Sequence, residues 1–128
     1  MRIIRSNDRA FVPAGHENPL SPGVLKKVLL EKADLQPGCI QMINWASLGP
    51  GKQFSLHYHE DMQEVFIMVQ GEADITVGTM ADTLHRDDTL VIDPREVHRM
   101  HNKTTETAEY IAIGITAETN GKTVVLEA

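Results

Sequence analysis

The stretch that decides the fold reads GKQFSLHYHEDMQEVFIMVQG and runs from Gly51 to Gly71. His57 and His59 stand two residues apart in it, and Glu64 opens the apolar run that follows. Because successive side chains on a β-strand point to opposite faces, the two imidazoles should project the same way. A turn between His59 and Glu64 would bring the carboxylate back beside them. The stretch therefore predicts nitrogen and oxygen donors of the kind that bind metal ions.

Another possible donor, His98, begins a strand-like segment further along the chain. A His-x-His pair on a strand is more often a pair of surface or hydrogen-bonded residues than a pair of metal ligands. The pair therefore gains weight only from the residues around it.

Length and charge limit the possible functions. The chain has 128 residues, which suits one domain, and 18 acidic against 12 basic side chains give a net charge of −6. An acidic chain without a cluster of Lys and Arg argues against a nucleic-acid partner. No apolar stretch approaches the roughly 20 residues that span a bilayer, and the first residues lack a signal-peptide pattern. With a single cysteine, Cys39, the sequence predicts a cytoplasmic protein without a membrane partner.

Short apolar blocks separated by turn residues predict an all-β protein. Residues 1–23 carry three prolines and are expected to form an irregular N-terminal arm, ahead of a single domain over 24–128. Asn120-Gly121 is a possible hairpin turn. The expected strands are 24–30, 40–48, 54–58, 65–69, 73–77, 89–92, 97–100, 108–115 and 123–126.

The deciding stretch resembles the cupin superfamily. Gly51, His57, His59, Glu64 and Gly71 match every fixed position of the first cupin motif. The resemblance covers about residues 40 to 115 and looks like the small single-domain cupins of the cupin 2 type.

The second cupin motif aligns with residues 87 to 102 and is only partly kept. His98 and Asn102 match it, whereas Asp87, Asp93 and Arg95 stand where glycine, proline and glycine are usual. The segment 93–96 places Asp and then Pro in the first two positions of a type I turn, which needs no glycine at its third. We therefore expect the turn to survive through different residues.

What the resemblance implies is a double-stranded β-helix, or jelly-roll barrel, with a metal ion inside one end. His57, His59, Glu64 and His98 would hold it. Three neutral imidazoles and a carboxylate suit one divalent transition metal, namely Fe, Mn, Ni, Zn, Co or Cu, better than calcium or magnesium. A six-coordinate ion would keep two positions open for water, substrate or oxygen.

Strand parity gives an expected pocket. Residues of the same parity as the metal ligands should face inward with them. No arginine or lysine is among them, so a strongly anionic substrate held by a salt bridge is not favoured. His16 lies in a turn-rich segment and is expected to have no functional role. The expected pocket residues are Gln53, Ser55, Phe66, Met68 and Met100.

Two functions remain open. The first is a metal-dependent enzyme, of dioxygenase, isomerase or lyase type, that acts on a small organic molecule. The second is a non-catalytic module that binds a sugar or another small molecule, because fold alone does not fix function. The opposite strand faces, with Phe54, Tyr58 and Val65 among their residues, are also apolar and predict a homodimer, with the N-terminal arm as a candidate for crossing between subunits.

Overall fold

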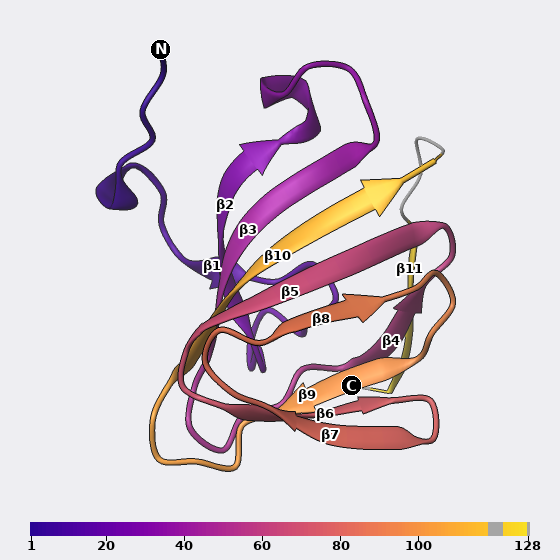
Figure 1. Cartoon of the computed structure of the whole chain (residues 1–128). Helices are drawn as coiled ribbons and strands as arrows, with labels where there is room; N and C mark the ends of the chain where they lie inside the picture. Colours follow the sequence, from indigo (N-terminus) through magenta and orange to yellow (C-terminus); the bar gives the residue numbers. More distant parts are fainter. Residues whose placement is uncertain (118–121, 128) are drawn as a thin grey trace.

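A computed structural model describes residues 1–117 and 122–127 and shows an all-β molecule of two antiparallel sheets (Figure 1). The larger sheet has the order β1-β2-β3-β10-β5-β8, and the smaller has the order β11-β4-β9-β6-β7. This is the double-stranded β-helix that the sequence predicts. The expected turn at Asn120-Gly121 lies outside the described residues.

The strands of the larger sheet are β1 (Val12–Pro13), β2 (Leu25–Glu31), β3 (Ile40–Leu48), β5 (Met62–Gln70), β8 (Thr89–Ile92) and β10 (Ala108–Thr116). Those of the smaller sheet are β4 (Leu56–His59), β6 (Ala73–Val77), β7 (Met80–Leu84), β9 (His98–His101) and β11 (Thr123–Glu127). Two short 3-10 turns, η1 (Ser6–Asp8) and η2 (Lys32–Asp34), complete the described elements.

Strand β10 shows why these residues form a two-layered barrel. Its side chains alternate along the whole strand between buried and half-buried. Ala108, Tyr110 and Ala112 point into the core, whereas Ile111 and Ile113 lie on the outer face. A period of two places one apolar face against the opposite sheet. The core between the sheets includes Leu48, Phe54, Met68, Ile92 and Met100.

The N-terminal arm and one edge strand differ from expectation. Within residues 1–23, β1 pairs with β2 through Val12 and Lys26, so the arm is less irregular than its prolines predict. Strand β7 was not expected, because it is an exposed edge strand with little apolar content. It follows a two-residue turn at Gly78, whose φ of 59° matches the left-handed geometry that tight hairpins need.

The altered second motif keeps its glycine conformation without glycine. Asp87 and Arg95 have φ angles of 72° and 68°, in the left-handed region that glycine favours. The amide of Glu96 donates to the carbonyl of Asp93, which closes a β-turn with Arg95 at its third position. A positive φ at that position belongs to a type II turn, so the expectation of a type I turn is wrong.

None of the helical segments in the described residues is long and apolar enough to cross a membrane.

Candidate metal centre

Two sheets supply the four expected donors, and the structure brings them together. His57 and His59 lie on β4, His98 lies on the adjacent β9 directly opposite His57, and Glu64 reaches over from β5. One donor atom from each residue can be chosen so that all four atoms lie within 4.8 Å of one another. The side chains are buried, with His98 at 0% exposure and Glu64 at 5%. Such a buried group of donors is consistent with a metal site.

Backbone carbonyls orient two of the imidazoles. His57 Nδ1 lies 2.5 Å from the carbonyl oxygen of Ser55, and His98 Nδ1 lies 2.8 Å from that of Glu96. A carbonyl only accepts, so each Nδ1 carries the proton and donates it. The lone pair of each ring is then on Nε2. Hydrogen bonds to the outer nitrogen are the usual way in which proteins fix the tautomer of a metal-binding histidine.

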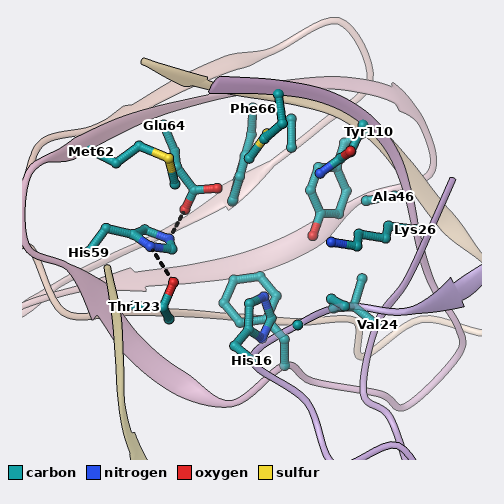
Figure 2. Close-up of a pocket in the computed structure, with 16 residues that line it drawn as sticks. His16, Val24, Lys26, Ala46, His59, Met62, Glu64, Phe66, Tyr110 and Thr123 are labelled. Carbon is teal, nitrogen blue, oxygen red and sulfur yellow. Dashed lines mark hydrogen bonds and ion pairs between the residues drawn. The ribbon is translucent and has the colours of Figure 1, made fainter. Parts of the chain in front are cut away.

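His59 is held between two side chains, as Figure 2 shows. Its Nε2 lies 2.7 Å from Glu64 Oε1, and its Nδ1 lies 2.9 Å from the hydroxyl of Thr123 on β11. The hydroxyl can donate or accept, so His59 can carry its proton on either nitrogen. With the proton on Nδ1, Thr123 Oγ1 accepts it and Nε2 is free for a metal. Sequence reasoning missed Thr123, because pairing of β11 with β4 is a long-range contact.

The electrostatics of the cluster keep His57 and Glu64 in the forms that metals need. Burial, together with the neighbouring His16 and His98, lowers the pKa of His57 to about 3, so the ring is neutral at pH 7. Burial alone would raise the pKa of Glu64, but the hydrogen bond from His59 and the nearby His98 ring outweigh it and lower that pKa below the ordinary value. Neutral imidazole and ionised carboxylate are the ligand forms.

One buried nitrogen atom without a hydrogen-bond partner indicates that the four donors fit a cation. His98 Nε2 is buried and has no hydrogen-bond partner among the described residues, although it lies 3.3 Å from Glu64 Oε1. Buried nitrogen atoms without partners are costly and rare. A divalent cation among the three Nε2 atoms and Glu64 would satisfy it, so the residues present fit the transition metal that the fold implies.

A cavity of about 310 Å³ opens beside the cluster (Figure 2). His59, Glu64 and Phe66 line it, together with residues from the larger sheet and the arm. Of the expected pocket residues, Phe66 alone lines this cavity, while Ser55, Met68 and Met100 are buried elsewhere in the barrel.

Gln53 corrects the parity argument. Its side chain is exposed and lines a different surface depression, whereas Phe54 is buried and lines the cavity. Strand β4 begins only at Leu56, so the alternation of strand residues does not extend back to Gln53. Phe54 therefore faces the core although parity placed it outside.

The N-terminal arm supplies a residue that sequence reasoning dismissed. The ring of His16 stacks on that of His57, with 4.0 Å between ring centroids and an interplanar angle of 22°. His16 Nδ1 lies 2.6 Å from Glu17 Oε2. No periodic pattern in a segment rich in proline and glycine could have placed His16 against the cluster.

Glu17 fastens the arm to the barrel. Its carboxylate accepts hydrogen bonds from the backbone amides of Gly23 and Ser55, each at 2.8 Å. Burial works to raise the pKa of Glu17, but the hydrogen bonds from His16 and these amides outweigh it and lower the pKa to about 2. Glu17 is therefore a buried anion with several donors, and it fixes the position of His16.

The larger sheet brings a cation to the cavity, contrary to the expectation that no lysine faces inward. Lys26 on β2 lines it, next to Ala46 on β3 and Tyr110 on β10. The expectation failed because parity was followed only along the strands that carry the metal ligands.

Comparison with known proteins finds the same fold. A family model described as "Cupin domain" matches residues 44–114. A solved structure described as a predicted oxalate decarboxylase from Thermotoga maritima superposes with a TM-score of 0.78 at 21% identity, covering 90% of this chain and 99% of that one. A sugar phosphate isomerase from Silicibacter pomeroyi gives a TM-score of 0.72 at 17% identity, covering 91% and 76% respectively.

One sequence relative is a mannose-1-phosphate guanylyltransferase from Sinorhizobium fredii. It is 36% identical over 53 residues, which are 41% of this chain and 10% of that protein. This match is therefore local, and the structural matches show the fold alone.

Proposed function

The chain belongs to the cupin domain family, and from that premise we propose that it is a metal-dependent enzyme acting on a small organic molecule. The observation that carries the proposal is the buried cluster of three imidazoles and one carboxylate beside a cavity of about 310 Å³. That volume lies at the lower end of the roughly 300–1,000 Å³ of small-molecule sites. The cofactor would be one divalent transition metal, and the reaction would be of dioxygenase, isomerase or lyase type.

The residues of the chain have distinct parts in this proposal. His57, His59, His98 and Glu64 would hold the ion, which when bound supplies Lewis-acid or oxygen-activating chemistry. Phe54 and Phe66 keep the cavity wall beside the cluster apolar. With Nδ1 of His16 tied to Glu17, its Nε2 is the ring atom left to hydrogen-bond a ligand.

Metal analysis tests the proposal. Protein purified without a metal-affinity column should hold close to one equivalent of a transition metal, and His57→Ala and His98→Ala should lose most of it while keeping a β-sheet circular dichroism spectrum. His85→Ala, an exposed histidine away from the cluster, is the control and should keep the metal. Full metal occupancy in His57→Ala would show that the assignment is wrong.

Metal-loaded protein that binds small molecules without converting them would favour the alternative function, a non-catalytic binding module.

We propose in addition a cytoplasmic homodimer without nucleic-acid or membrane partners. The half-buried apolar side chains on the outer face of β10, Ile111 and Ile113, support the dimer.

A further inference from the structure

We propose that the cavity recognises a carboxylate, held by Lys26 and Tyr110 at the end away from the metal cluster. The inference rests on the proposed function, because the other end of the same molecule would meet the metal. In Figure 2, His59 and Glu64 stand at one side of the cavity, and the ends of Lys26 and Tyr110 point into it from the other.

The register of the larger sheet places the two polar groups together. Ala46 on β3 pairs with Lys26 on β2 on one side and with Tyr110 on β10 on the other. All three line the cavity. The small side chain of Ala46 leaves room above it, so an ammonium and a phenol face the same space. One cation and one hydroxyl donor can each bind an oxygen of a carboxylate.

Neither the Lys26 ammonium nor the Tyr110 hydroxyl has another bonding partner among the described residues. Among residues 1–117 and 122–127, no carboxylate forms an ion pair with Lys26 and no hydrogen bond to the Tyr110 hydroxyl is found. Burial and the charges of Glu64 and Glu17 raise the pKa of Tyr110, so its hydroxyl keeps its proton and remains a donor. A half-buried lysine that lines a small-molecule cavity and has no carboxylate partner there suits the recognition of an anion.

A third polar side chain, that of Asn44, lines the same cavity. Asn44 lies two residues before Ala46 on β3 and also lines the cavity. It is 7% exposed, and its Oδ1 has no hydrogen-bond partner among the described residues. A buried acceptor without a donor is unfavourable unless a ligand or water supplies one. A hydroxyl group on the ligand would do so, and this favours a carboxylate that also carries a hydroxyl.

Geometry sets the length of the ligand. Glu64 pairs with Gly114 on β10, and Tyr110 lies four residues along the same strand. At roughly 3.4 Å per residue, the two ends of the cavity are on the order of 14 Å apart at the backbone, and side chains fill part of that distance. A hydroxy acid of about four to six carbons spans what remains.

The lining at the far end favours a carboxylate over a phosphate. Lys26 supplies a single ammonium there, beside the hydroxyl of Tyr110. The cavity lining includes no arginine, the side chain whose planar fork suits phosphate best. A single carboxylate at Lys26 and Tyr110, with the other end of the ligand towards the metal cluster, matches this lining.

Calorimetry with matched acids and amides tests the inference. The probes are 4-hydroxybutanoate, 6-hydroxyhexanoate and D-glucuronate, each beside its primary amide, with inorganic phosphate as a further anion. Wild-type protein loaded with Mn²⁺ should bind at least one acid about tenfold more tightly than its amide. In Lys26→Met that preference should fall below about threefold, whereas Lys52→Met, which removes an exposed lysine outside the cavity, should keep it. Metal content is measured on every sample.

The outcomes separate the two proposals. Wild-type protein that takes up no metal contradicts the proposed function. Metal-loaded protein that binds acid and amide alike, binds none of the acids, binds phosphate more tightly than the acids, or keeps its preference in Lys26→Met overturns the carboxylate inference. Tyr110→Phe gives a second check, since it should weaken the acids severalfold and leave the metal content unchanged.

Discussion

At the scale of single residues, the buried Glu17 has a larger structural role than its place in the N-terminal arm predicts. Its carboxylate accepts hydrogen bonds from His16 and Gly23 within the arm and from Ser55 just before β4, so it joins the arm to the barrel. Sequence analysis identified the four expected donors from the first cupin motif and from the match of His98 to the second, and it missed Glu17 and His16 because no motif or period places the arm against the barrel.

Removing the charge of Glu17 should destabilise the protein in a pH-dependent way. With a pKa of about 2 in the folded state against an ordinary 4.5, the carboxylate contributes stability above pH 4.5 that is lost as the pH falls through about 2. Glu17→Gln should therefore cost about 2 kcal/mol at pH 7, the range for hydrogen bonds to charged groups. Urea unfolding of metal-free protein measures this cost.

The difference between Glu17→Gln and the wild type should shrink as the pH falls from 4.5 towards 2. Glu106→Gln, at an exposed side chain, should change the free energy of unfolding by less than about 0.5 kcal/mol at any pH. A constant difference between Glu17→Gln and wild type across this range would rule out the carboxylate charge as its source.

At the scale of elements, the turn before β9 positions His98 without the glycine that its motif expects. Arg95 holds a φ of 68°, and its backbone amide donates to the carbonyl of His59 at 2.7 Å. The turn thus links the end of β4 to the start of β9. Sequence reasoning found the turn but assigned the wrong type, because proline at its second position is common to types I and II.

Replacing Arg95 with glycine should stabilise the turn. A non-glycine residue in the left-handed region costs about 1 kcal/mol, which glycine avoids. Arg95→Gly should therefore raise the free energy of unfolding by up to about 1 kcal/mol, while Arg95→Ala, which removes the side chain but keeps Cβ, should not. Chemical denaturation measures both. Equal stability of the glycine and alanine variants would show that the backbone at residue 95 is not strained.

Gly71 offers the opposite experiment. It has a φ of 73°, and a Cβ there would lie 2.8 Å from the carbonyl oxygen of Thr107. Gly71→Ala should lower the stability by about 1–3 kcal/mol through strain and the close approach, and the melting temperature should fall accordingly. Gly51→Ala has a similar φ and no atom within 4 Å of its Cβ, so its smaller loss separates the two causes.

At the scale of the whole molecule, the outer face of the larger sheet is apolar across several strands. Ile111 on β10 pairs with Trp45 on β3 and with Ile67 on β5, and all three are half-buried. The resemblance to the cupins predicted the barrel, and the apolar residues on both faces of the expected strands predicted an outer face that needs cover. The sequence did not predict β7 or β1, whose short polar or proline-containing segments carry no clear period.

The outer layer predicts a dimer in solution. Light scattering after size exclusion should give about twice the 14.2 kDa mass of the chain. Ile111→Glu should shift the protein towards monomer by placing a charge in the interface, whereas Met80→Glu, at a residue that is 77% exposed on β7, should not. A wild-type monomer at micromolar concentration would contradict the dimer.

The placement of β10 between β3 and β5 bears on when the candidate site could bind a metal ion. The four donors have all been synthesised by residue 98, yet β5, which carries Glu64, is joined to β3 only through β10, at residues 108–116. A nascent chain therefore holds the donors before it holds the barrel that arranges them. An ion held by these four donors would therefore be selected late, by a nearly finished chain, from the metals available where folding ends.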